Sequence, residues 1–159
     1  MSGNPKFNKL LQKVGRLDKV LIISPHPDDD VIGMGGAMEM MPEKTNVRVL
    51  YMTNGDGATD KKGERLKEAL SAIKILGYDK INIIDGDMPF YRSKDRVVSE
   101  ADYSRFKDIL LDFMPNHIFL CKDSDPKKTH DKCAEIVEKV TKEPFEFLRC
   151  IWYYMGAWG

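Results

Sequence analysis

Residues 24–36 read Ser-Pro-His-Pro-Asp-Asp-Asp-Val-Ile-Gly-Met-Gly-Gly, and this stretch decides the fold. It follows an apolar run over residues 20–23, which predicts a buried strand, and its glycines lead into a predicted helix over residues 33–41. One histidine and consecutive carboxylates therefore stand where a strand ends. Carboxylates this close together repel one another, and a bound cation would account for their being together. A solvated turn that caps the following helix is the other interpretation.

Predicted strands and helices alternate outward from this stretch. The strands are expected over residues 19–24, 46–53, 80–84, 117–121 and 148–155, and the helices over residues 5–17, 33–41, 60–76, 99–114 and 129–142. This alternation predicts an α/β domain, a Rossmann-like three-layer fold whose mainly parallel sheet of about five strands has helices on both faces. The loops that follow the strands then share one edge of the sheet, where ligands bind in such folds.

Composition excludes several classes of function. The chain has 159 residues and a formal net charge of +0, so no strong field favours nucleic acid or a membrane surface as a partner. No apolar run is long enough to span a bilayer, and residues 1–9 lack the apolar core of a signal peptide. The cysteines form no C-x-x-C pair, which favours reduced thiols in a cytoplasmic protein. We expect a single domain over residues 1–159, whose aromatic last residues favour a fragment of a longer chain.

The histidines offer few ways to complete a metal site. A catalytic zinc ion takes three protein ligands and keeps a position for water. His26 and Asp29 could supply two of these ligands, and His130, which opens the helix after the fourth strand, could supply the third. His117 begins a strand at the opposite edge, so we expect it to be structural. Spacing alone leaves an ordinary polar turn equally open.

The stretch Pro-His-Pro-Asp-Asp-Asp over residues 25–30 resembles the P-H-P-D-D-[ED] signature of the LmbE/PIG-L family of zinc-dependent N-acetylglucosamine-type de-N-acetylases. Supporting segments follow in order, namely a T-x-G loop at residues 53–57, an R-x-x-E-A…LG helix at residues 65–77, and the run from residue 115 to His130. A narrower likeness, carried by residues 88–91, 99–102, 125–130 and 155–158, is to LmbE-like domains fused to glucosamine-6-phosphate deaminases.

The resemblance implies a hydrolase that removes the N-acetyl group from an N-acetylglucosamine-type sugar. It implies one zinc ion, Zn²⁺, on His26, Asp29 and His130, with Asp28 as the general base and Asp30 as a helix cap or a support for a neighbour. The narrower likeness implies an amino-sugar phosphate as the substrate and a fused or associated amino-sugar enzyme domain as a partner.

Several residues are candidates for binding the substrate. Arg65 and Asp87 fall where the family contacts sugar hydroxyls, and Asn54 follows the second strand at the same edge. Arg92 could meet a sugar phosphate, because guanidinium suits bidentate phosphate contacts. Each has an ordinary alternative, since Arg65 could pair with Glu68 or Asp60 on an exposed helix face and the others could be plain loop residues.

One departure from the family pattern bears on activity. The family motif H-x-D-H is replaced over residues 127–130, so that Lys127 stands at its first histidine and Thr129 at its aspartate. Lys127 could stabilise an oxyanion as a catalytic partner of Asp28, but a lysine is a poor proton shuttle near neutral pH. A catalytically weakened metal- or sugar-binding domain is therefore an alternative.

A magnesium-binding receiver-like domain is a further alternative. Receivers also carry acidic residues after the first strand, and Asp28 and Asp29 with Asp85 after the third strand could be assigned that way. His26, flanked by prolines, fits a receiver poorly.

Overall fold

The computed structural model describes residues 12–56 and 63–156. Within these residues the strands form one five-stranded parallel sheet in the order β3-β2-β1-β4-β5. The strands are β1 (Val20–Ser24), β2 (Val47–Tyr51), β3 (Ile83–Asp85), β4 (His117–Cys121) and β5 (Cys150–Tyr154). The predicted α/β fold is confirmed, and the carboxyl ends of all five strands lie at one edge of the sheet.

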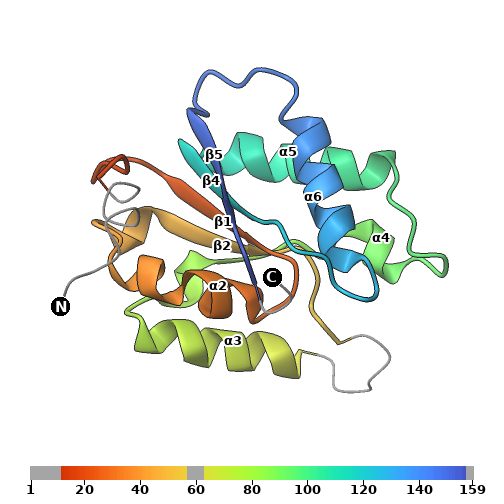
Figure 1. Cartoon of the computed structure of the whole chain (residues 1–159), viewed down its shortest axis with the longest axis horizontal. Helices are drawn as coiled ribbons and strands as arrows, with labels where there is room; N and C mark the ends of the chain where they lie inside the picture. The colour runs from red at the N-terminus through yellow and green to blue at the C-terminus, as the bar shows by residue number, and fades with distance from the viewer. Residues whose placement is uncertain (1–11, 57–62, 157–159) are drawn as a thin grey trace.

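Helices cover both faces of the sheet, as Figure 1 shows. They are α2 (Asp29–Glu39), α3 (Glu64–Ile75), α4 (Pro89–Arg92), α5 (Glu100–Phe113) and α6 (Thr129–Val140). Side chains alternate along each buried strand, so Val20 and Ile22 pack into one core with α2 and α3. Leu21 and Ile23 pack into the other core with α5 and α6. This burial on both faces explains why β1 is continuously apolar.

Two helices near the polar loops differ from the predicted elements. Helix α2 begins at Asp29 rather than at Gly33, with Ile32 N–H donating to the Asp28 carbonyl at 3.0 Å. Carboxylates in the first turn favour this start because they face the positive end of the helix dipole. Helix α4 lies in the predicted loop after β3, with proline at its first position.

Two predicted helices extend beyond the described residues. Of the first, residues 5–11 lie outside the described part, and residues 12–17 form turns and no helix. Residues 60–62 of the helix predicted over residues 60–76 lie outside it as well, and α3 begins at Glu64.

The strand order contradicts the receiver-like alternative. Receivers use the order 2-1-3-4-5, which places the third strand beside the first. Here β2 separates β3 from β1, and Asp85 lies exposed at the end of an edge strand. Asp85 is therefore two strands away from the acidic residues that follow β1.

No helix within the described residues combines the length and the apolar character needed to cross a membrane.

Candidate active site

The site lies where the loop after β1 meets the loop after β4, at the carboxyl edge of the sheet. These two strands are neighbours although a long segment separates them in the sequence, because the chain builds β2 and β3 on one side of β1 and then returns to the other. This is the topological switch point at which ligands bind in open α/β sheets.

His26, Asp29 and His130 come together as the sequence predicts. His26 Nδ1 lies 3.1 Å from His130 Nε2 and 3.4 Å from Asp29 Oδ2, and His130 Nε2 lies 3.2 Å from Asp29 Oδ2. The backbone N–H of His26 also donates to Asp29 Oδ2 at 2.9 Å, which fixes the turn between β1 and α2. His130 is fully buried and His26 partly exposed, so the three donor atoms form a group that solvent reaches from one side.

The geometry of these donor atoms fits a metal ion. Ligand atoms about 2.0–2.1 Å from a tetrahedral zinc ion lie about 3.3 Å from one another. The three measured separations, 3.1, 3.4 and 3.2 Å, surround that value. Two histidines and one carboxylate form a donor set typical of catalytic zinc, so the residues present fit the ion.

The charges in the group favour the same interpretation. Burial alone would raise the pKa of Asp29, but hydrogen bonds with His130 and His26 lower it well below its usual range. Burial would lower the pKa of His130, but its bonds to Asp29, Cys121 and Asp123 raise that pKa to about 11. Both shifts reflect the negative charge that Asp29 and Asp123 place around His130, at the position where a cation would bind.

Asp28 is next to this group, but its side chain does not cap α2. Its Oδ2 accepts from Arg65 Nη2 at 2.8 Å, and Arg65 Nη1 donates to the carbonyl of Gly55 at 3.2 Å. The structure thus pairs Arg65 with Asp28 and not with Glu68, and Asp60, the other alternative partner, lies outside the described residues. A Cβ at Gly55 would lie 2.6 Å from Arg65 Nη1, and the φ of 69° at this residue favours glycine. The T-x-G loop thus gives the guanidinium room to reach Asp28.

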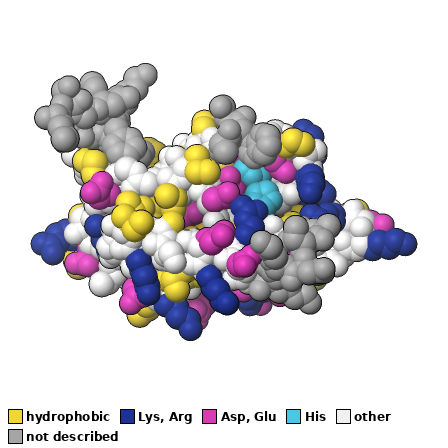
Figure 2. Space-filling view, turned by 90° about the horizontal axis from the view of Figure 1, so that it is seen from below, with side chains coloured by type: hydrophobic (Ala, Val, Ile, Leu, Met, Phe, Trp, Pro, Cys, Tyr) yellow, Lys and Arg dark blue, Asp and Glu magenta, His cyan; other side chains and the backbone are white. Residues whose placement is uncertain are grey.

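A cavity of about 330 Å³ opens over these groups. The residues that line it are His26, Asp28, Asp29, Arg65, Asp125, Pro126 and Lys127. Figure 2 shows histidine at the surface between acidic and basic side chains. Lys127 is exposed, and its ammonium group forms no ion pair with another described residue. The cavity is therefore lined by the donor group and by two cationic side chains, Arg65, which is paired with Asp28, and Lys127, which is unpaired among the described residues.

The third aspartate of the motif faces the interior. Asp30 is fully buried, accepts from Tyr51 Oη at 3.0 Å and bonds Ser24 Oγ at 3.2 Å. Ser24 Oγ in turn donates to the His26 carbonyl at 2.6 Å. Burial raises the pKa of Asp30 to about 6 despite the hydrogen bonds from Tyr51 and Ser24. Of the two roles expected for Asp30, the structure favours the support of a neighbour, because it braces the turn that carries His26.

Sequence reasoning missed the residues behind His130. Asp123 accepts from His130 Nδ1 through Oδ1, and Cys121 Sγ lies 3.2 Å from the same oxygen. Asp125 accepts from the backbone N–H of His130 at 2.8 Å and holds the loop that precedes α6. The sequence signal for them was two aspartates, Asp123 and Asp125, between a predicted buried strand and the candidate ligand His130. Ordinary loops often contain such residues, so the signal did not assign them a role.

Three predicted substrate residues do not line this cavity. Asp87 and Arg92 pair with each other at 2.7 Å, and that hydrogen bond raises the pKa of Arg92. Asn54 is buried, and its side chain accepts from the backbone N–H of Asp56 at 3.2 Å. All three follow β2 or β3 at the carboxyl edge, and their contacts with a substrate stay predictions.

His117 is structural, as expected. It lies at the amino end of β4, where it is buried and contacts Asp18 at 3.1 Å. Trp152 donates to its other ring nitrogen at 3.2 Å.

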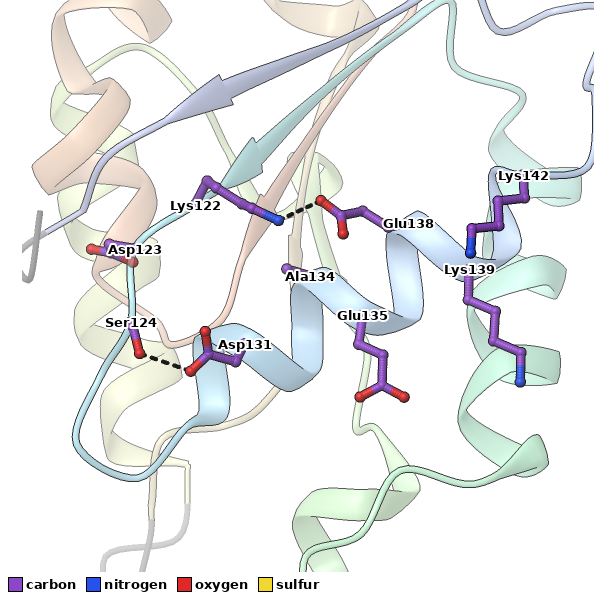
Figure 3. A pocket seen from close by; sticks show the side chains of 9 residues that line it. All are labelled: Lys122, Asp123, Ser124, Asp131, Ala134, Glu135, Glu138, Lys139 and Lys142. Carbon is purple, nitrogen blue, oxygen red and sulfur yellow. Dashed lines mark hydrogen bonds and ion pairs between the residues drawn. The ribbon is translucent and has the colours of Figure 1, made fainter.

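A larger cavity of about 490 Å³ lies beside α6. Figure 3 shows two polar pairs in its wall, Lys122 with Glu138 at 2.5 Å and Ser124 with Asp131 at 2.8 Å. Pairs of surface side chains of this kind do not indicate a bound ligand, so we do not assign a function to this cavity.

Known proteins resemble this chain in sequence or in fold. The chain is 27% identical to a glucosamine-6-phosphate deaminase-like protein of Bacteroides thetaiotaomicron, over 89% of this chain and 31% of that protein. It is 37% identical to diacetylchitobiose deacetylase of Thermococcus kodakarensis, over 53% of this chain and 36% of that protein. The matches thus span about a third of each relative. A conserved protein of Thermus thermophilus has the same fold, with a TM-score of 0.64 at 23% identity, covering 89% of this chain and 67% of that chain.

A family model also matches most of the chain. The model describes GlcNAc-PI de-N-acetylase, PIG-L, and matches residues 21–141, which include most of β1, the donor group and all of α6. The donor atoms, the acidic turn and the helix that carries Arg65 all lie inside the matched segment. The chain belongs to the PIG-L family of de-N-acetylases.

Proposed function

We propose that this domain hydrolyses the N-acetyl group of an N-acetylglucosamine-type sugar. The observation that carries the proposal is the triangle of donor atoms from His26, Asp29 and His130, with Asp28 beside it in the same cavity. Family membership supports the reaction class, and the diacetylchitobiose deacetylase relative supports an amino sugar as the substrate.

His26, Asp29 and His130 would hold a divalent metal ion, and zinc suits this donor set best. When bound, such an ion lowers the pKa of a water molecule and polarises the carbonyl group of the acetamide. Asp125, which fixes the backbone of His130, and Asp30, which braces the turn of His26, keep two of the ligands in place.

Asp28 is positioned to act as the general base. Arg65 occupies its Oδ2, which leaves Oδ1 to accept the proton of the attacking water. The same carboxyl group can then donate that proton to the departing amine. Lys127, at the cavity wall, can stabilise negative charge on the acetamide oxygen. The products are acetate and the free amino sugar.

We further propose an amino-sugar phosphate as the substrate. The unpaired Lys127 at the cavity supports an anionic group, and one relative is named glucosamine-6-phosphate deaminase-like. That relative extends well beyond the matched segment, which supports a fused or associated amino-sugar enzyme domain as a partner.

Acetate release tests the proposal. The zinc-loaded protein is incubated with N-acetylglucosamine, its 6-phosphate and diacetylchitobiose. Asp28→Asn should lower turnover by about 100-fold or more, the usual contribution of a general base, while zinc remains bound. His130→Ala should lose the zinc. Zinc loss in Asp28→Asn would mean that Asp28 is a ligand.

A zinc- or sugar-binding domain with little turnover is the second candidate. The replacement of the family's paired histidine and aspartate by Lys127 and Thr129 favours it, because Thr129 is buried and cannot titrate. Binding of these sugars to the zinc-loaded protein without any acetate release would establish this candidate and exclude the hydrolase.

A further inference from the structure

His130 has a supporting chain of contacts on the side away from the cavity. Its Nδ1 bonds Asp123 Oδ1, and Asp123 Oδ2 accepts from the backbone N–H of Gly156 at 3.0 Å. The imidazole of His130 and the carboxylate of Asp123 are almost completely shielded from water. Figure 3 shows the Asp123 carboxylate on the side of its loop away from Glu135 and Lys139. Asp123 is thus bonded at both oxygens and has one orientation.

Gly156 approaches this carboxylate more closely than other residues could. A Cβ at position 156 would lie 2.9 Å from Asp123 Oδ2, 3.1 Å from Asp29 Oδ1 and 3.2 Å from Cys121 Sγ. Real Cβ atoms rarely make contacts this short, and two of these three atoms belong to carboxylates around the donor group. The absence of a side chain therefore allows the backbone to bond Asp123.

The segment that ends at Gly156 is fixed independently of the site. Tyr154 Oη donates to the carbonyl of Ile23 in β1 at 2.7 Å, and the Tyr154 carbonyl accepts from Lys122 N–H at 2.8 Å. Gly33 of α2 packs against Tyr154 so closely that a Cβ there would lie 2.5 Å from its ring. The end of β5 is consequently a rigid support.

We propose that Asp123, oriented by the backbone N–H of Gly156, is a positioning residue that holds His130 with Nδ1 protonated and the Nε2 lone pair directed at His26 and Asp29. The other ring nitrogen of a metal-bound histidine commonly donates to a carboxylate, which fixes the tautomer and the ring orientation. The inference rests on the metal site of the proposed function and extends it to the end of β5.

Cys121, Asp123 and His130 could instead be ligands of a second ion, since their donor atoms also cluster. Their closeness to Gly156 opposes this, because the backbone of Gly156 already occupies one side of the group. The two interpretations differ in stoichiometry. The positioning role predicts one zinc ion per chain in both the wild type and the Cys121→Ser variant. A second metal site predicts two zinc ions per chain in the wild type and one in Cys121→Ser.

The experiment measures zinc affinity by competition with a chelator, and the His130 Nδ1–H resonance by ¹⁵N NMR of the zinc-loaded protein. In the Asp123→Asn variant the side chain has only one acceptor oxygen. If this oxygen accepts from His130, the amide NH₂ faces the Gly156 N–H, and two donors cannot bond each other. One of the two contacts of Asp123 is therefore lost in this variant. Zinc affinity should fall by about 10- to 100-fold, the usual effect of losing such a partner. The downfield, slowly exchanging Nδ1–H resonance of the wild type should move upfield.

Gly156→Ala should weaken zinc binding in the same direction. Gly36→Ala is the matched control, because a Cβ at Gly36 in α2 meets nothing within 4 Å. The Nδ1–H resonance of His130 can be measured in the wild-type protein alone, so the proposal can be tested even if the Asp123→Asn variant folds poorly. Unchanged zinc affinity in both Asp123→Asn and Gly156→Ala, or a second zinc equivalent in the wild type, would overturn it. None of these readouts uses acetate release, so an inactive domain would contradict the proposed function and leave this inference intact.

Discussion

Asp28, Asp29 and Asp30 differ in environment because successive residues at the start of a helix point about 100° apart. Asp29 points to the two histidines, Asp30 points inward to Tyr51, and Asp28 remains at the surface with Arg65. The sequence motif predicts that the three have separate roles, but it does not contain the neighbours that assign them. Tyr51 comes from β2 and His130 from α6, so these partners depend on the packing of distant segments.

The same limit explains why Asp123 was missed while His130 was predicted. A histidine at the carboxyl edge of the sheet is a candidate ligand from its type and place alone. The role of Asp123 depends on which nitrogen of His130 faces the cavity, and this depends on the orientation of the ring.

The pairing of Arg65 with Asp28 leads to a prediction about turnover. Arg65→Lys should lower kcat/KM for acetate release by about 10- to 100-fold, because an ammonium group cannot bond Asp28 and the Gly55 carbonyl in the same fork. Zinc affinity should not change, since Arg65 contacts none of the proposed ligands. Arg16→Lys, at an exposed arginine, is the control and should keep wild-type values for both. Wild-type turnover in Arg65→Lys would show that the pair has no part in the reaction.

At the scale of elements, propensity predicts long segments better than short ones. Helix α5 begins after Ser99 as predicted, and a capping box with Asp102 explains this. Helix α4 was not predicted, because it has four residues, too few for a periodic pattern to be recognised. It forms where Asp102 accepts from the backbone N–H of Phe90 at 2.7 Å. One carboxylate thus caps α5 and fixes α4 beside it.

Replacing Asp102 tests this double role. The carboxylate is fully buried and accepts three hydrogen bonds, from Phe90 N–H, Ser99 N–H and Ser99 Oγ. Asp102→Ala should lower the free energy of unfolding by about 2–4 kcal/mol, since buried donors lose a charged partner. Glu100→Ala in the same helical turn should cost less than about 0.5 kcal/mol, because Glu100 is exposed. Urea unfolding measures both, and equal losses would contradict the role given to Asp102.

At the scale of the whole molecule, the two edges of the sheet carry different kinds of polar contact. The carboxyl edge gathers the donor group and the cavity, as expected for a parallel sheet whose loops all follow their strands at one edge. The amino edge holds a cluster of Asp18, His117 and the exposed Arg149, which joins the start of β1 to the starts of β4 and β5. The sequence indicated the first edge by its unusual motif. It indicated the second only by the place of His117, because Asp18 and Arg149 are ordinary residues in the sequence.

The amino-edge cluster makes stability depend on pH. Burial would raise the pKa of Asp18, but hydrogen bonds from Gly15 and His117 and the charge of Arg149 lower it below its ordinary value of 3.8. A carboxyl group with a lowered pKa in the folded state stabilises the protein above its unfolded pKa, and this contribution is lost as the pH falls through the folded value.

Asp18→Asn should therefore lower the free energy of unfolding by about 1–2 kcal/mol at pH 7, and this difference should shrink below pH 4. Urea unfolding of both proteins between pH 3 and pH 8 measures the difference, with Asp108→Asn, an exposed aspartate of α5, as the control that should show almost none. A difference that stays constant down to pH 3 would show that Asp18 acts through its shape and not through its charge.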